Sequence, residues 1–172
     1  FQKIRKENLD FIKLCLNSNL VTDITIQPLN RFDLDAAIIF SDILIIPYGL
    51  GQKVEFKKGK GPILEECDPK KILAAEETDV IKKFKPIYQA INQVKNKTKK
   101  NVIGFTGAPW TLLLYMLNKE SPKNNFNFNL ITKNKLLVNQ LLEKLVNIIV
   151  FHIAKQIEAG ADIIQIFDSW AG

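Results

Sequence analysis

The stretch that decides the fold is residues 35–42, which read Asp-Ala-Ala-Ile-Ile-Phe-Ser-Asp. Its centre is a short, continuous apolar run, which is typical of a strand that is covered on both faces, as in a parallel sheet. Residues 102–105 and 162–167 contain two further runs of the same kind. Because the segments between the runs carry apolar residues at helical spacing, the sequence predicts an α/β fold with a parallel sheet.

Helices are expected before the first strand and between the strands. The predicted helical segments are residues 7–17, residues 20–32 despite Pro28, residues 84–94 entered near Pro86, residues 110–117, and a long helix from about Lys133 to Glu158 that Gly160 ends as a C-cap. Alternating apolar residues within 52–58 predict a small hairpin arm. Residues 118–129 are polar and without periodicity, so we expect a mobile loop there.

The elements follow the order strand, helix, strand, helix, helix, strand, which produces a parallel sheet with right-handed crossovers. Either an open doubly wound sheet or a closed (β/α)8 barrel fits this order. No Gly-x-Gly-x-x-Gly motif follows a predicted strand, which weakens the dinucleotide-binding version of the open sheet. A barrel needs about 250 residues, whereas this chain has 172 and no initiator Met. We therefore expect a partial (β/α)8 TIM barrel, roughly the N-terminal half, in a fragment of a longer protein.

One incomplete barrel domain is expected over residues 1–172, with N-terminal helices in residues 1–32 and the first three strands with their helices in residues 33–172. No stretch approaches the roughly 18 apolar residues of a membrane span, and the N-terminus does not resemble a signal peptide. Cys15 and Cys67 are too few for a disulfide framework and have no spaced metal partners. These features predict a cytoplasmic protein without membrane association.

The net charge of +6 raises the alternative of a basic module that binds nucleic acid. All 24 basic residues except Arg5 and Arg31 are lysine, and the lysines are scattered along the chain. Nucleic-acid readers depend on the guanidinium fork of arginine. We therefore favour coding bias as the origin of the charge and expect no nucleic-acid partner.

Candidate chemistry lies where the predicted strands end, because sites in parallel α/β folds gather at the carboxyl ends of the strands. These ends read Phe40-Ser41-Asp42, Phe105-Thr106-Gly107 and Phe167-Asp168-Ser169. An aromatic-walled mouth with one or two carboxylates would suit a flat, partly apolar ligand that bears N–H donors. Asp42 stands before the apolar residues 43–46, where a carboxylate is costly without a purpose. The residues alone leave a structural and a functional role for Asp42 equally open.

Other polar residues have simpler interpretations. Asp168 is expected to form a turn or cap a helix, with Ser169 as the better candidate for ligand contact. His152 lies in the long helix, where packing is a commoner role than catalysis. Tyr115 lies on a predicted helix and could belong to the core.

Long blocks of this sequence resemble uroporphyrinogen decarboxylases, namely residues 25–32, 35–44, 104–112 and 160–172. The resemblance extends over essentially the whole chain. It implies a (β/α)8 barrel that forms a homodimer and needs no metal or organic cofactor. It also implies conversion of uroporphyrinogen III, a small polycarboxylate tetrapyrrole, into coproporphyrinogen III on the route to haem, by removal of four acetate carboxyls.

The resemblance assigns roles to particular positions. Asp42 matches the family's central aspartate, which meets the pyrrole N–H groups and stabilises a cationic intermediate. Tyr115 and Ser169 match substrate-binding residues. The positions that match apolar walls of the substrate site are Ile38, Phe40, Phe105 and Phe167.

The sequence also departs from the family pattern. An arginine-bearing segment expected before Phe1 and a histidine from the second half are absent, so we expect this fragment alone to be inactive. Asn30 stands in place of a usual arginine and Thr106 in place of a usual alanine. Residues 118–129 lack a glycine-rich run. The alternative enzyme class is a methyltransferase of the same barrel superfamily, which carries zinc through late His and Cys residues, so the metal content of the full-length protein would distinguish the two.

Overall fold

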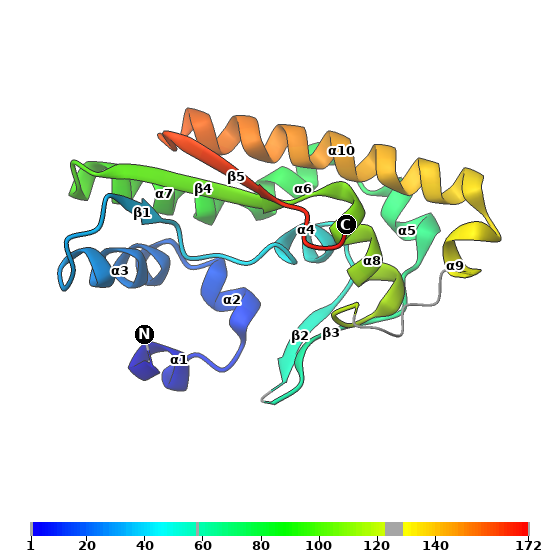
Figure 1. Cartoon of the computed structure of the whole chain (residues 1–172), viewed down its shortest axis with the longest axis horizontal. Coiled ribbons are helices and arrows are strands. Elements are labelled where there is room, and N and C mark those ends of the chain that lie inside the picture. The colour runs from blue at the N-terminus through cyan, green and yellow to red at the C-terminus, as the bar shows by residue number, and fades with distance from the viewer. Residues whose placement is uncertain (1, 58, 123–128, 172) are drawn as a thin grey trace.

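The computed structural model describes residues 2–57, 59–122 and 129–171. Its centre is a three-stranded parallel sheet in the order β1 (Ala36–Ile38), β4 (Asn101–Gly107) and β5 (Ile163–Phe167), as Figure 1 shows. In the register of the sheet, Ile38 pairs with Ile103, and Ile103 pairs with Ile163. The predicted α/β class, the three strands and their parallel order are therefore confirmed.

Ten helices accompany the strands within the described residues. They are α1 (Gln2–Glu7), α2 (Phe11–Cys15), α3 (Ser18–Leu29), α4 (Ile45–Gly49), α5 (Pro69–Ala74), α6 (Glu77–Lys83), α7 (Lys85–Lys97), α8 (Pro109–Asn118), α9 (Asn129–Thr132) and α10 (Lys135–Glu158). The predicted helices around residues 20–32, 84–94, 110–117 and 133–158 are confirmed as α3, α7, α8 and α10. Gly160 follows α10 with a φ of +108°, a left-handed conformation that suits the glycine expected there.

The continuous helix expected over residues 7–17 is wrong, because local capping breaks the segment. Asp10 accepts a hydrogen bond from the backbone N–H of Lys13 and begins α2. Asn17 accepts one from the N–H of Leu20 and begins α3. The short helices α5 and α6 were not predicted, since neither is long enough to show a clear apolar period.

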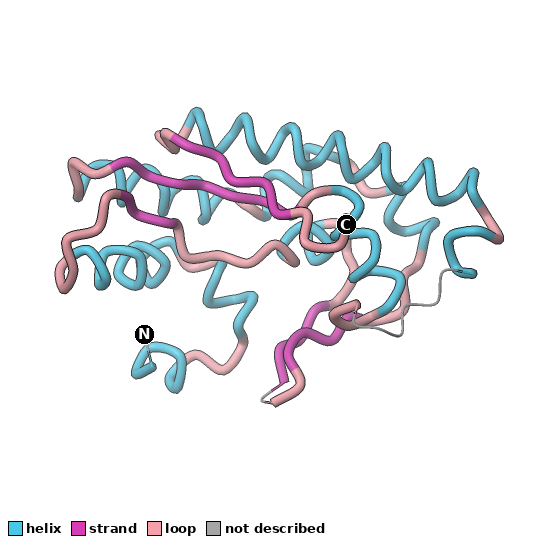
Figure 2. The backbone as a smooth tube through the Cα atoms, viewed as in Figure 1, coloured by secondary structure: helices cyan, strands magenta, loops and turns pink. Residues whose placement is uncertain are grey.

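The predicted hairpin arm is confirmed as the antiparallel pair β2 (Val54–Lys57) and β3 (Gly61–Leu64), which Figure 2 shows apart from the main sheet. The N–H of Leu64 donates to the carbonyl of Lys119 at 2.7 Å, and Ile63 forms a bridge with Glu120. This pairing ties the hairpin to the segment after α8. The predicted mobile loop includes residues 123–128, which lie outside the described residues.

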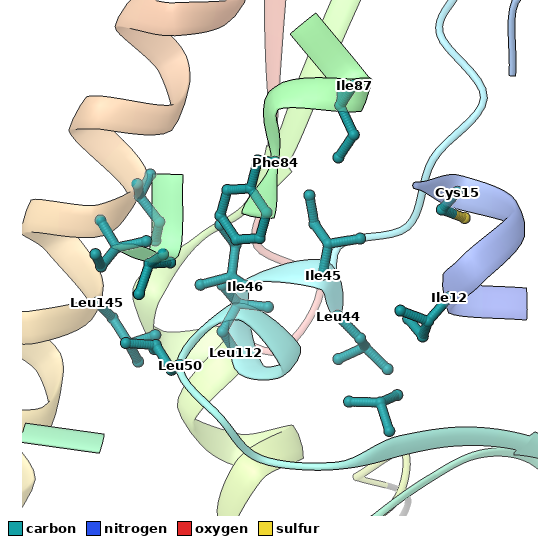
Figure 3. Packing of buried hydrophobic residues seen from close by; sticks show 14 of the residues in the cluster. Ile12, Cys15, Leu44, Ile45, Ile46, Leu50, Phe84, Ile87, Leu112 and Leu145 are labelled. Atoms are coloured by element: carbon teal, nitrogen blue, oxygen red, sulfur yellow. The ribbon is translucent and has the colours of Figure 1, made fainter. Parts of the chain in front are cut away.

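The core lies between the helices and one face of the sheet. Figure 3 shows Ile45 and Ile46 of α4 in the same apolar cluster as Phe84 and Leu145. The apolar stretch after Asp42 is therefore a short buried helix. The burial of this helix fixes the position of the segment that connects β1 to α4.

The long helix α10 packs one face against this core, where Leu145, Ile148 and His152 are buried. By length and composition alone it could also cross a membrane, so the expectation that no stretch approaches such a span is wrong for this segment. The core helix of a soluble protein passes the same test, and one such helix is weak evidence for a membrane. Val146 and Val150 are exposed on its outer face.

The face of the sheet opposite the helices is open to solvent. Ile38 is 62% exposed, and Ile163 and Phe167 are 47% and 42% exposed. The prediction that these strands are covered on both faces is therefore wrong. The interior of a barrel is filled by layers of side chains from all its strands, and three strands supply only part of each layer.

Candidate active site

A cavity of about 450 Å³ lies beside β1, which is an edge strand of the sheet, and is lined by β1, by the residues that follow it and by α3. All four predicted wall residues line this cavity, namely Ile38, Phe40, Phe105 and Phe167. Residues of α3, including Ile24 and Pro28, line it as well. The structure thus brings together apolar positions that are up to 129 residues apart in the chain (167 − 38).

Aromatic contacts order this wall. The rings of Phe105 and Phe167 meet edge to face, with centroids 5.6 Å apart. Phe40 makes a similar contact with Phe11 of α2 at 5.7 Å. Edge-to-face pairs add about 0.5–1.5 kcal/mol beyond the burial of their area. The wall therefore has a defined shape before any ligand enters.

One residue that sequence reasoning missed, Thr25, holds the chain just after β1. The hydroxyl of Thr25 on α3 accepts a hydrogen bond from the backbone N–H of Phe40 at 3.0 Å. Ser41 lines the cavity, and its buried hydroxyl has no hydrogen-bond partner among the described residues. Buried polar groups are normally satisfied. No pattern in the sequence distinguishes the Thr25 hydroxyl from those of other Ser and Thr residues, whereas Ser41 belongs to one of the predicted strand ends.

Asp42 follows Ser41 and does not line the cavity itself. One carboxylate oxygen accepts a hydrogen bond from the N–H of Leu44 at 2.8 Å. Burial raises the pKa of Asp42 from 3.8 to about 6, and the Leu44 hydrogen bond opposes that rise. The carboxylate is therefore still the dominant form at neutral pH, in surroundings that disfavour its charge. A cation near Asp42 would relieve this cost and be stabilised strongly in return.

Ser169 and Tyr115 lie outside the cavity that the wall residues share. Ser169 is exposed in a turn after β5, and the half-buried Tyr115 donates a long hydrogen bond of 3.4 Å to Ser121. Thr111 donates to the carboxylate of Asp168 at 2.7 Å and accepts from the N–H of Trp170. The predicted turn role of Asp168 is confirmed, because its carboxylate fastens the turn to the first turn of α8.

His152 has the packing role expected for it. It is 1% exposed, and its Nδ1 lies 2.9 Å from the hydroxyl of Tyr88. Burial lowers the pKa of His152 to about 3, so the imidazole is neutral. Phe84 contacts its ring at 5.3 Å between centroids. Among the described residues, no group of three or more His, Cys, Asp or Glu side chains is placed to hold a metal ion.

These features define a class of protein: a parallel α/β protein with part of a barrel, which carries an aromatic-walled cavity beside a half-buried carboxylate. The model of the uroporphyrinogen decarboxylase (URO-D) family matches residues 1–172. The chain therefore belongs to the uroporphyrinogen decarboxylase family.

Curated relatives carry the same name. A uroporphyrinogen decarboxylase from Rickettsia bellii is 38% identical over 176 residues, which cover 100% of this chain and 52% of the relative. One from Aliarcobacter butzleri is 38% identical over 179 residues, covering 99% of this chain and 51% of the relative. The chain thus spans about half the length of the curated relatives it matches.

A solved structure of a methyltransferase from Methanosarcina mazei superposes with a TM-score of 0.74 at 17% identity. The match covers 95% of this chain and 50% of that protein. At this identity the likeness concerns the fold alone, and it agrees with a partial barrel.

Proposed function

We propose that the full-length protein containing this chain decarboxylates uroporphyrinogen III to coproporphyrinogen III in porphyrin biosynthesis, with Asp42 as the central catalytic residue. The observation that carries the proposal is the half-buried, desolvated carboxylate of Asp42, which lies next to Ser41 of an aromatic-walled cavity, in a member of this family. A tetrapyrrole has the matching chemistry, since its rings are flat and apolar and its pyrrole N–H groups are donors.

The proposed reaction uses the pyrrole ring as an electron sink. Protonation of a ring carbon gives a cation, and the electron pair of the acetate C–CO₂ bond then flows into the ring as carbon dioxide leaves. A second proton is added to the remaining methylene carbon while the first returns to solvent, so each acetate becomes a methyl group. The fixed carboxylate of Asp42 would stabilise the cation in a site that is poor in water.

Other residues have supporting roles in this proposal. Ile38, Phe40, Phe105 and Phe167 would form the apolar wall against the macrocycle, and Tyr115 and Ser169 would contact the substrate. Residues 1–172 would form one incomplete barrel domain of a cytoplasmic homodimer. The exposed inner face of the sheet fits an incomplete barrel, because Ile38, Ile163 and Phe167 would be covered by further strands.

The test is an anaerobic incubation of the full-length protein with uroporphyrinogen III, without added metal or cofactor, followed by mass spectrometry. Stepwise loss of four molecules of carbon dioxide is expected, with Asp42→Asn as the paired inactive variant. If the folded protein removes no carboxyl while the Rickettsia bellii relative is active in parallel, the proposal is wrong. In that case, zinc bound to the full-length protein would indicate the methyltransferase class.

A further inference from the structure

Gln156 of α10 is a buried polar side chain whose hydrogen bonds converge on one residue of the cavity wall. It is 1% exposed. Its Oε1 accepts a hydrogen bond from the backbone N–H of Phe105 at 3.0 Å, and its Nε2 donates to the carbonyl of Phe105 at 3.1 Å. The carboxamide therefore forms hydrogen bonds with both the N–H and the carbonyl of a single strand residue.

The register of the sheet explains why these two groups need a partner. β1 pairs with β4 as far as Ile103, whose carbonyl accepts from the N–H of Ile39 at 3.0 Å. Alternate residues of a strand direct their backbone groups to the same side, so those of Phe105 also face β1. The named pairing of β1 and β4 has ended by that point. The side chain of Gln156 thus supplies hydrogen bonds to β4 in place of β1, at the point where β1 leaves the sheet and leads to Ser41 and Asp42.

Gly104 provides the space for this contact. A Cβ atom at position 104 would lie 2.4 Å from the Oε1 of Gln156 and 3.1 Å from the Cδ1 of Ile164. Any larger residue would push the carboxamide away from the strand. The position of the Gln156 side chain on α10 therefore depends on a glycine at position 104 of β4, although 52 positions separate the two residues in the sequence (156 − 104).

We propose that Gln156 is a positioning residue of the site, which fixes the Phe105 wall at the point where β1 diverges from β4. This inference rests on the proposed function for its effect on the substrate. Gln156 itself would touch no reacting atom. It holds the backbone of Phe105, whose ring packs against Phe167 and lines the cavity. Release of this contact should loosen the wall and weaken substrate binding, while the cation partner Asp42 stays in place.

The direct test is Gln156→Glu, with hydrogen exchange at the Phe105 amide followed by NMR on the full-length protein. A protonated Glu offers one acceptor and one donor, as Gln does, whereas an ionised Glu has lost the donor. Burial raises the pKa of such a carboxyl. We expect near-wild-type protection of the Phe105 amide at about pH 5 and at least about tenfold faster exchange at about pH 8. Wild-type protein at both pH values corrects for intrinsic exchange and for other groups that titrate, Asp42 included.

Gln52→Glu is the matched control. Gln52 is 4% exposed, and its Nε2 donates to the carbonyls of Glu65 and Met116, away from the Phe105 backbone. This change should lower overall stability without selective loss of protection at Phe105. A second variant, Gly104→Ala, displaces the carboxamide without removing a hydrogen-bonding group. It should speed exchange at Phe105 at both pH values.

Kinetics of the full-length protein provide the second readout. At high pH, Gln156→Glu is expected to raise KM about tenfold and to change kcat less than about twofold. This result is expected when a variant loses a binding interaction that is equally strong in the ground state and in the transition state. Unchanged exchange at Phe105 in both Gln156→Glu and Gly104→Ala would overturn the positioning role. The positioning role would also be overturned if Gln52→Glu changed KM and kcat by as much as Gln156→Glu does. Absence of turnover in wild type would refute the proposed function instead, and the exchange measurement would still decide whether Gln156 holds Phe105.

Discussion

Replacement of Asp42 by Asn should stabilise the folded chain and abolish turnover in the full-length protein. The change keeps the size of the side chain and the oxygen that accepts from the N–H of Leu44. It removes the charge that burial opposes. Catalytic groups held at the expense of stability are common in active sites, so both effects together would mark Asp42 as functional.

The magnitude follows from the pKa of Asp42, which burial raises from 3.8 to about 6. The folded state then binds a proton more readily than the unfolded state, so wild-type stability falls as pH rises between these values. Ionisation of Asp42 lowers the free energy of unfolding by about 0.6 kcal/mol at pH 4 and by about 3 kcal/mol at pH 7. The stability gained in Asp42→Asn should grow over the same pH range.

The assay is urea unfolding of both proteins, followed by circular dichroism at pH 4 and pH 7. Asp162→Asn is the opposite control, because the hydrogen bond from Lys95 lowers the pKa of Asp162 and the N–H of Val102 adds to this effect. That change should destabilise the chain at pH 7. In the full-length protein, Asp42→Asn should lower kcat by at least about 100-fold, in line with the loss of one electrostatic group in other active sites.

Two results would refute this reasoning. If Asp42→Asn is no more stable than wild type at pH 7, the carboxylate is not held at the expense of stability. If the variant retains near-normal turnover while folded, the carboxylate has no role in stabilising the cation, and its burial would need another explanation.

Further outcomes follow from the same contacts. The kcat/KM of the full-length protein should fall about tenfold per pH unit below about pH 6, because protonation removes the charge of Asp42; a profile that is flat down to pH 5 would contradict this. Tyr88→Phe removes the hydroxyl beside Nδ1 of His152 and should lower the free energy of unfolding by about 1–3 kcal/mol in urea, whereas no change would mean that the imidazole finds another partner. Leu145→Ala should cost about 2–5 kcal/mol because the side chain is fully buried, and the exposed Val150→Ala on the same helix should stay within about 0.5 kcal/mol. Equal losses at the two positions would show that the outer face of α10 is also covered in solution.

Most of the secondary structure could be predicted because its signals are local. The apolar runs within residues 35–42, 102–105 and 162–167, which form β1, β4 and β5, and the long period of α10 each lie within one segment. Errors arose where local chemistry is subtle, as at Asp10, whose cap divides the expected helix. The short helices α5 and α6 were missed for the related reason that a few residues cannot display a period.

Exposure was predicted less well than secondary structure. The apolar run of β1 indicates a strand but cannot indicate how many neighbours cover it, and Ile38 is exposed because three strands do not fill a barrel interior. The composition of α10 fits either a core helix or a membrane span. Only packing against β4, α5, α6 and α8 shows that one of its faces belongs to the core.

The sequence by itself determined the α/β class, the order of the strands along the chain, the aromatic residues at the strand ends and the family, because these depend on local patterns and on long blocks of similar residues. The tertiary structure decided how far burial perturbs Asp42, which of the candidate residues share a cavity, and how Gln156 reaches Phe105 across Gly104. Desolvation and hydrogen bonding depend on distances between segments that are remote in the chain. Such distances are set when helices pack on the sheet, and no local pattern records them.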